Sequence, residues 1–268
     1  MKLMGIVNVT PDSFSDGGEF FDRDRAIEHG RALFDAGAEI VDVGGESTRP
    51  YAIPVDEEEE RDRVVDVVGE LARFGRVSVD TRRRSVAVAA VSAGATLIND
   101  VSASLGRTAA ELGVGWVAMH MRGEPSTMQR TPTYHDVVGE VVAFLQSKVA
   151  LAEHLGIDEL YLDPGIGFGK TAAHNLAILH SIDRIVDIGP PVVLGISRKN
   201  FLGRLSRVDR DSPAPPKDRL EGSLAAAAWC AKSAVAVLRV HDVAETDQLR
   251  RLWAVATEAL KGREDGGS

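Results

Sequence analysis

Short apolar runs alternate along the chain with longer segments in which apolar residues recur at helical spacing. Each run has the length of a buried strand, and the stretch between two runs is long enough for one helix, which is the pattern of repeated strand and helix units on a parallel sheet. Eight strands are predicted, at residues 3–8, 40–44, 77–80, 96–100, 116–121, 160–163, 192–197 and 235–241.

The intervening segments predict the helices of these units, at residues 23–36, 57–72, 85–93, 107–112, 135–154, 173–186, 220–232 and 245–261. Eight strand and helix units in a chain of this length fit an α/β fold of the (β/α)8 TIM-barrel type, formed by a single domain over residues 1–261. A polar, frayed tail is expected at 262–268. A doubly wound open sheet remains the alternative, because hydrophobic periodicity does not report whether a sheet closes.

Composition narrows the classes of function. The net charge of −9 and pI near 5.3 argue against nucleic acid or a membrane surface as a partner, because binding phosphates needs clustered Lys and Arg. The single cysteine, Cys230, excludes an internal disulfide and a cysteine-based metal cluster. No apolar run has the length of a signal peptide core or a membrane span, so a cytoplasmic protein is expected.

Two polar stretches have simple structural interpretations. The acidic run 56–60 is predicted to be a solvated first helical turn, where negative charge suits the helix dipole, rather than a metal site. The proline-containing stretch 207–217 is predicted to be a long exposed loop after the seventh strand, either a lid or a surface excursion.

The Gly-rich stretch 163–170 begins at the last residue of the sixth predicted strand, and its final two residues form a Gly-Lys-Thr sequence with Thr171. A Walker A loop would need Gly where Pro164 stands, and a dinucleotide fingerprint would need Gly where Lys170 stands. Both nucleotide motifs are therefore excluded. The stretch is typical of a turn that places a carboxylate, Asp163, at a strand end and lets the backbone approach a ligand.

Polar or ligand-binding side chains stand at or just beyond the end of every predicted strand. They are Asn8, Asp12, Glu46, Arg49, Asp80, Asn99, Asp100, Met119, His120, Asp163, Ser197, Lys199, Arg239 and His241. Any one of them could be a cap or turn residue. Their presence at all eight ends favours one site, because the strand ends of such a barrel meet on the catalytic face.

These residues form two chemical groups. The polar members of the first group are Asp80, Asn99, Asp163 and Lys199. They suit a flat polar heterocycle, since carboxylates, an amide and an amine can bind ring N–H groups and ring acceptors. Met119 and Phe168 could sandwich such a ring. The second suits an oxyanion such as phosphate or pyrophosphate and comprises Asn8, Arg49, Arg239 and His241, with Ser47 and Thr48 nearby. Asn8 and nearby carboxylates can also offer oxygen ligands to Mg²⁺.

Several motifs together resemble the dihydropteroate synthase family. They lie at residues 4–18 (MGIVNVTPDSFSDGG), 42–50 (DVGGESTRP), 78–81 (SVDT), 99–101 (NDV), 119–123 (MHMRG), 127–129 (TMQ), 163–170 (DPGIGFGK), 197–199 (SRK), 222–224 (GSL) and 239–242 (RVHD). The resemblance covers nearly the whole chain in order. It implies a TIM barrel, a homodimer, and condensation of 7,8-dihydropterin-6-ylmethyl diphosphate with p-aminobenzoate in folate synthesis, releasing pyrophosphate.

The resemblance also implies residue roles. Pterin would be bound by Asp80, Asn99, Val101, Met119, Asp163, Phe168, Gly195 and Lys199. Pyrophosphate and p-aminobenzoate would be bound by Thr48, Arg49, Ser197, Arg239 and His241. Asn8 would bind the cofactor Mg²⁺, and Asp12 would stabilise a pterin-methyl cation. The residues expected to act in catalysis are Asp12, Arg49, Lys199, Arg239 and His241.

Departures and alternatives remain. Tyr51 replaces a usual Gly in the second motif, and residues 102–104 read Ser-Ala-Ser instead of Ser-Gly-Gly. Lys199 could form a Schiff base in an aldolase-like barrel. A pterin-dependent methyltransferase would share the carboxylate and amide edge, and a catalytically idle paralogue would bind pterin without turnover.

Overall fold

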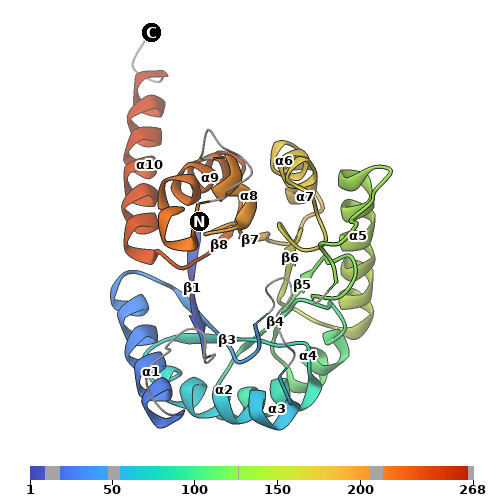
Figure 1. Ribbon diagram of the computed structural model, residues 1–268. Helices are drawn as coiled ribbons and strands as arrows, with labels where there is room; N and C mark the ends of the chain where they lie inside the picture. Colours follow the sequence, from blue (N-terminus) through green and yellow to red (C-terminus); the bar gives the residue numbers. More distant parts are fainter. Residues whose placement is uncertain (10–18, 48–54, 126, 206–213, 265–268) are drawn as a thin grey trace.

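Eight parallel strands form a barrel surrounded by helices (Figure 1). The computed structural model describes residues 1–9, 19–47, 55–125, 127–205 and 214–264. The strands are β1 (Lys2–Asn8), β2 (Ile40–Gly44), β3 (Arg76–Asp80), β4 (Leu97–Asp100), β5 (Gly115–Met119), β6 (Leu160–Asp163), β7 (Val193–Gly195) and β8 (Val237–Val240). Their order is β6-β5-β4-β3-β2-β1-β8-β7, and a parallel bridge between Leu162 and Val192 joins β6 to β7. The bridge closes the sheet, so the predicted (β/α)8 barrel is confirmed and the open sheet is excluded.

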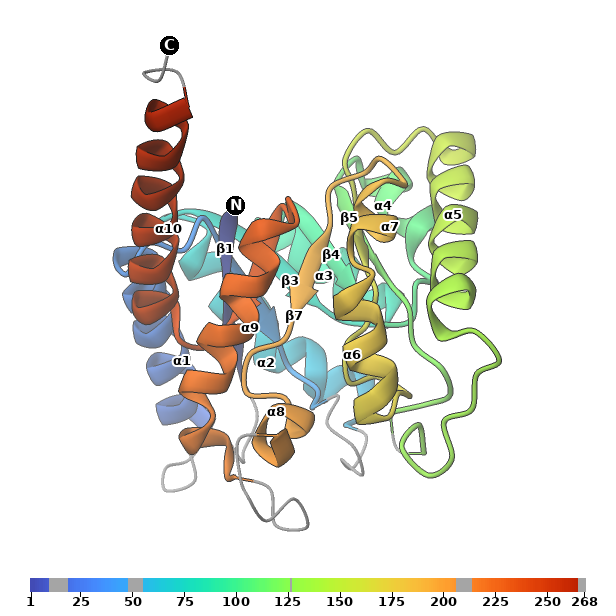
Figure 2. The ribbon, with the colours of Figure 1, turned by 90° about the horizontal axis from the view of Figure 1, so that it is seen from above.

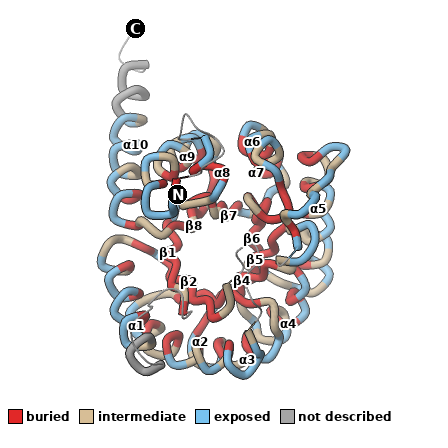
Figure 3. The backbone as a smooth tube through the Cα atoms, viewed as in Figure 1, coloured by how far each residue is buried: buried red, intermediate tan, exposed pale blue. Residues whose placement is uncertain are grey.

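The helices lie outside the barrel and expose their outer faces (Figure 3). They are α1 (Glu19–Asp35), α2 (Glu57–Leu71), α3 (Arg84–Ala93), α4 (Gly106–Leu112), α5 (Val137–Leu155), α6 (Ala172–His180), α7 (Asp183–Val186), α8 (Asn200–Leu205), α9 (Leu220–Lys232) and α10 (Val243–Glu264), with a 3₁₀ turn, η2 (Pro216–Asp218), before α9. None of the helices in the described part of the chain is long and apolar enough to cross a membrane.

The strands alternate between two apolar environments, as their period of two requires. One set of buried side chains packs against the helices and includes Val41, Val43 and Leu162. A second, smaller cluster comprises Met4, Ile40, Leu97, Val117, Tyr161, Val193 and Val237. Because these seven residues come from seven strands and alternate with the helix-facing set, they fill the interior of the barrel.

On four of these strands, the inward position two residues after the interior cluster is polar, and Val237 is followed in this way by Arg239. Ile40 is followed by Asp42, Leu97 by Asn99, and Tyr161 by Asp163. The apolar cluster therefore forms the floor on which the polar residues stand, at the carboxyl ends of the strands. The side view in Figure 2 shows α8 at that same end of the barrel, where it follows β7.

Some predicted elements differ in detail. The segment predicted as one helix at 173–186 is two helices, α6 and α7, and α8 was not predicted. Helix α10 continues to Glu264, so part of the expected tail is helical, and residues 265–268 lie outside the described part. In the acidic turn, Asp56 caps α2 as expected of a helix start, but Glu60 is fully buried rather than solvated.

Candidate active site

Strand register brings the predicted site residues together in pairs. Asp80 at the end of β3 is paired with Asn99 on β4. Met119 at the end of β5 is paired with Asp163 on β6. Gly195 on β7 is paired with Arg239 on β8. Each pair lies at the carboxyl-end face, where barrel enzymes place their active sites.

Arg239 connects three of the strands inside the barrel. Its Nε donates to Asp42 Oδ2 at 2.6 Å, and its Nη2 donates to Asp80 Oδ2 at 2.7 Å. Asn99 Nδ2 donates to the same Asp42 oxygen at 2.8 Å. Arg239, a member of the predicted oxyanion group, therefore contacts Asp80 of the predicted heterocycle group. The two groups of residues are adjacent in the structure and form one continuous site.

Asp42 was absent from the predicted site, although it lies at its centre with no solvent exposure. Its signal in the sequence was a carboxylate at the inward position of a strand that is otherwise apolar up to Gly44. Asp42 Oδ1 and the neighbouring Ser78 Oγ are the buried side-chain polar atoms without a hydrogen-bond partner among the described residues. Asp42 and Ser78 are paired in register, so the two atoms mark a polar spot beneath the site.

An apolar wall stands beside the polar residues. Val101, Met119, Met128 and Phe168 form one buried cluster, to which the structure adds Met128 as a member that sequence reasoning missed. Lys199 Nζ lies 4.2 Å from the centre of the Phe168 ring, a cation–π distance. A flat ring bound here would meet thioether and aromatic surface on one side and hydrogen-bonding groups at its edge.

Burial shifts the pKa values of three charged groups in the pocket toward neutrality. Desolvation raises the pKa of Asp80 to about 7, although Arg239 opposes the shift. Desolvation likewise lowers the pKa of Lys199 to about 8, and the charge of Arg239 adds to this effect. The pKa of Asp163 is raised for the same reason. Near pH 7 the pocket can therefore hold or release a proton at several points, which is typical of functional sites.

The loop after β6 is held from several sides. Asp163 Oδ1 accepts from the Gly165 N–H at 2.7 Å, and Asn175 Oδ1 accepts from the Gly167 N–H at 2.8 Å. Gly165 has φ +67°, and a Cβ placed there would meet the His120 carbonyl oxygen at 1.8 Å. Glycine is required at this position because both the backbone angle and the close approach exclude a side chain.

The loop after β7 places two further predicted residues. Ser197 Oγ lies 3.1 Å from His241 Nδ1 and accepts from the His241 backbone N–H at 3.2 Å. Arg198 between Ser197 and Lys199 has φ +58°, which is uncommon for a residue with a side chain. Its side chain pairs with Asp242, and its N–H donates to Ser223 Oγ, so neighbouring elements fix the turn that aims Ser197 and Lys199.

Three predicted residues, Asp12, Thr48 and Arg49, lie outside the described residues, as does Tyr51. Asn8 is half-buried at the end of β1 and is paired in register with Gly44. Within the described ranges no three His, Cys, Asp or Glu side chains form a metal cluster. An amide oxygen at a strand end still fits Mg²⁺ when most of its ligands are substrate phosphates and water, because this ion seldom uses an all-protein cage.

Comparisons with known proteins agree with this geometry. The family model described as "Pterin binding enzyme" matches residues 4–241. A dihydropteroate synthase of Mycobacterium leprae is 45% identical over 264 residues, which cover 95% of this chain and 93% of the relative. The chain belongs to the dihydropteroate synthase family of pterin-binding enzymes.

Solved structures of this family superpose closely on the chain. Dihydropteroate synthase from Xanthomonas albilineans with 4-aminobenzoic acid has a TM-score of 0.87 and 44% identity, covering 95% of this chain and 93% of that one. The same organism's enzyme in complex with 7,8-dihydropteroate has a TM-score of 0.85 and 40% identity, covering 96% and 93%. Family membership therefore rests on sequence and structure over nearly the full length.

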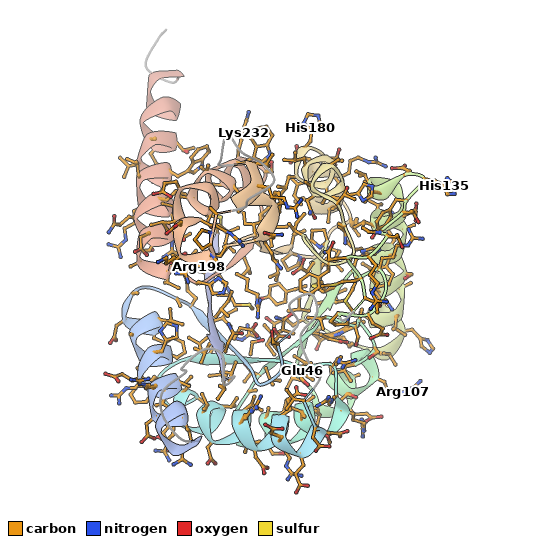
Figure 4. All side chains as sticks on the ribbon, viewed as in Figure 1. Glu46, Arg107, His135, His180, Arg198 and Lys232 are labelled. Atoms are coloured by element: carbon orange, nitrogen blue, oxygen red, sulfur yellow. The ribbon has the colours of Figure 1, made fainter. Side chains whose placement is uncertain are left out.

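Glu46 lies on the site side of the barrel, unlike the exposed polar side chains of the outer helices. In Figure 4, His180 and Lys232 point outward from α6 and α9, whereas Glu46 lies inside the ring of helices. Glu46 accepts hydrogen bonds from Arg82, Arg83 and the Val55 N–H, so it holds both ends of the segment that carries Thr48 and Arg49 in the sequence. Sequence reasoning had named Glu46 only as a residue at a strand end.

Proposed function

We propose that this chain is a dihydropteroate synthase that joins p-aminobenzoate to 7,8-dihydropterin-6-ylmethyl diphosphate. The observation that carries the proposal is the pairing of a buried carboxylate edge, made by Asp80, Asn99 and Asp163, with the wall formed by Met119 and Phe168. This combination suits a planar ring whose edge carries N–H groups. Relatives of known structure contain 4-aminobenzoic acid and 7,8-dihydropteroate, which supports the same ligands here.

Asp163 would bind the amino-pyrimidine edge of the pterin, since a carboxylate accepts two parallel N–H groups. Asn99 and Asp80 would complete the edge, and Lys199 would donate to a ring carbonyl or imine nitrogen. Val101, Met119, Phe168 and Gly195 would contact the faces of the ring. Their common position around the carboxyl ends of β4 to β7 supports one continuous pterin pocket.

Thr48, Arg49, Ser197, Arg239 and His241 would bind pyrophosphate or p-aminobenzoate. Ser197 and His241 are in mutual contact, and Arg239 on β8 lies two residues before His241, which follows the strand directly. Positive groups and N–H donors at this edge would stabilise the negative charge that grows on the departing pyrophosphate. Asp12, if it approaches the methylene carbon, would stabilise positive charge on the pterin-methyl group.

The chemistry requires no side-chain nucleophile. The aniline nitrogen of p-aminobenzoate attacks the pterin methylene carbon, the carbon–oxygen bond to the diphosphate breaks, and the new amine loses one proton. Lys199 then acts as a positive hydrogen-bond donor rather than as a Schiff-base amine. Its contact with Phe168 and its neighbours Asp80 and Asp163 support that role, since they hold its charge inside the pocket.

We assign Mg²⁺ as the cofactor, with Asn8 as its protein ligand among the described residues. When bound together with the substrate, Mg²⁺ would neutralise part of the diphosphate charge. The half-buried position of Asn8 at the strand-end face supports this assignment.

A pyrophosphate-release assay with both substrates tests the proposal. Turnover that needs both substrates is expected, whereas pterin binding without release would identify an idle paralogue. Borohydride treatment in the presence of a carbonyl substrate should leave Lys199 unmodified. Trapping at Lys199, or methyl transfer in place of pyrophosphate release, would overturn the assignment in favour of another barrel enzyme.

We further propose that the enzyme is a cytoplasmic homodimer and that a second copy covers an apolar groove formed by α6, α8 and α9. The groove has a volume of about 530 Å³, and its lining includes Leu176, Phe201, Leu205 and Trp229. Trp229 is 55% exposed, Leu176 44% and Leu205 42%, so large apolar side chains gather at one place on the surface. Such a patch is typical of an interface.

The lone Cys230, which is free, accords with a reducing compartment.

A further inference from the structure

Lys170 is the residue of the Gly-rich stretch that the proposed reaction leaves without a role. It ends the loop after β6 and is 2% exposed. A lysine is almost never buried unless its ammonium group is paired, because desolvating the charge is costly. The hydrogen-bond partners of the Lys170 ammonium group therefore indicate which part of the structure it stabilises.

The ammonium group of Lys170 faces four acceptors. Nζ lies 2.9 Å from the Gly165 carbonyl oxygen, 3.0 Å from that of Phe168 and 3.3 Å from that of His120. It also lies 2.9 Å from His120 Nδ1. Burial lowers the pKa of His120 to about 3, so its neutral ring accepts through Nδ1 and carries its proton on Nε2.

Two of these acceptors belong to residues that shape the pterin pocket. Gly165 donates its N–H to Asp163 Oδ1, so the Gly165 carbonyl that Lys170 holds lies one Cα away from the N–H that orients the carboxylate assigned to the pterin edge. Phe168 forms the wall with Met119 and Met128. Lys170 thus connects the edge and the wall through one group, while its His120 contacts anchor that group to the end of β5.

The rest of the loop is held less tightly by single neutral hydrogen bonds. Gln129 Nε2 donates to the Gly167 carbonyl at 2.5 Å, and the Tyr134 hydroxyl donates to the Gly169 carbonyl at 2.9 Å. Bonds from a charged donor are roughly twice as strong as neutral ones. Lys170 is therefore the principal internal support of the loop.

We propose that Lys170 is a positioning residue for the pterin half of the reaction, holding Asp163 and Phe168 in their binding arrangement without touching the substrate. The inference rests on the proposed function. It assigns a role to a group behind the pocket, and it predicts a selective loss: pterin binding should weaken, whereas pyrophosphate binding at the opposite set of residues should not.

The test compares Lys170→Met with the wild type at pH 6, where Lys170, whose pKa burial lowers to about 7, is mainly protonated. The Kd for the pterin diphosphate in the presence of Mg²⁺ should rise at least about tenfold, because the substitution leaves four buried acceptors without their donor. The Kd for inorganic pyrophosphate with Mg²⁺ should change by less than about twofold, and kcat at saturating substrate should fall far less than kcat/KM.

Lys148→Met is the matched control, since Lys148 Nζ also donates to a backbone carbonyl, that of Ala103, which lies outside the loop after β6. It should leave both Kd values near those of the wild type. If Lys170→Met does not fold, Lys170→Gln tests the same support, because its amide keeps N–H donors at this position without the charge, and a smaller rise in the pterin Kd is expected.

The outcomes separate the two proposals. Wild-type protein that neither binds the pterin diphosphate nor turns over would refute the proposed function. Active wild type together with an unchanged pterin Kd in Lys170→Met, or in Lys170→Gln where that variant replaces it, would refute the positioning role. Equal weakening of pterin and pyrophosphate binding would also refute it, because general damage to the barrel would then explain the loss.

Discussion

Asp163 is the residue whose exchange gives the most direct test of the pterin pocket. Asp163→Asn keeps the shape of the side chain but replaces one acceptor oxygen with an N–H₂ donor that faces the N–H groups of the pterin. We expect pterin binding to weaken by about 1 to 3 kcal/mol, the cost of leaving such a group unpaired. Isothermal titration with the pterin diphosphate measures it.

Asp158→Asn provides the control. Asp158 is exposed just before β6, so this substitution makes the same chemical change outside the pocket. It should bind pterin as the wild type does. Equal affinity of Asp163→Asn and the wild type would remove Asp163 from the pterin edge and require another carboxylate, with Asp42 and Asp80 as the nearest candidates in the site.

His120 should make the protein sensitive to acid. Its pKa is lowered to about 3 by burial and then by Lys170, whereas the unfolded chain has a histidine pKa near 6.5. Between these values the unfolded state binds more protons, so stability is complete above pH 6.5 and falls as the pH falls toward 3. The loss from this group approaches about 1.4 kcal/mol per pH unit.

Urea unfolding at pH 6.5 and pH 5 measures this loss. His120→Gln should flatten the decline, since Gln can accept from Lys170 without titrating. His135→Gln, which changes an exposed histidine just before α5, should keep the wild-type decline (Figure 4). If His120→Gln and wild type lose stability in parallel, acid sensitivity arises from other groups.

Individual site residues were predictable where they end a strand and unpredictable where they act through a distant partner. Asp80, Asn99 and Asp163 follow apolar runs, so their place on the catalytic face follows from the strand pattern. Asp42 is joined to Arg239 across 197 positions of sequence, and only the pairing of β8 with β1 brings them together. A strand pattern records which side a residue faces but not which residue lies opposite.

The loop between β6 and α6 depends on backbone geometry as much as on side chains. Gly169 has φ +61°, and a Cβ there would lie 2.2 Å from the Arg122 carbonyl oxygen. Gly156 has a similar φ of +70° with nothing within 4 Å. The two glycines therefore separate the cost of a left-handed backbone from the cost of a steric clash.

Gly156→Ala should destabilise the fold by about 1 to 2 kcal/mol, the cost of the left-handed conformation. Gly169→Ala should cost more than this and should also weaken pterin binding, because the loop must move away from Arg122 and carry Phe168 with it. Denaturant unfolding and pterin titration of both variants test the difference. Equal destabilisation, with pterin affinity unchanged in both, would show that the close approach to Arg122 is unimportant.

The ends of each strand were predicted to within two residues, because the apolar runs of a parallel barrel have clear ends. The division between α6 and α7 was missed for a local reason. Arg184 and Ile185 donate to the residues three positions before them, Ser181 and Ile182, which tightens one turn without interrupting the apolar periodicity. Helix α8 was missed because six residues are too few to show a helical period.

Closure of the barrel joins these local features into one site. The order of strands places β1 between β2 and β8, so residues near both ends of the chain meet, and Arg239 reaches Asp42 and Asp80 across that junction. The pairing of the central charges therefore depends on the contact between β8 and β1. The described polar groups of the proposed pocket lie on strands of this one barrel or in the loops that follow them.

The apolar groove over α6, α8 and α9 gives the final prediction. Trp229→Glu places a charge where the proposed second copy would bury an indole ring, and an unpaired buried charge is costly. We expect the wild type to sediment as a dimer at micromolar concentration and the variant as a monomer with a similar melting temperature. Because the described pocket residues come from one chain, pterin affinity of the monomer should stay within about twofold of the wild type.

Leu252→Glu is the matched control, since Leu252 on α10 is 72% exposed and does not line the groove. It should remain dimeric. A monomeric wild type at every concentration, or a Trp229→Glu variant that still sediments as a dimer, would show that a second copy does not cover this groove. Dissociation by both variants would instead place the interface over α10 as well, because adjacent α9 and α10 would then share it.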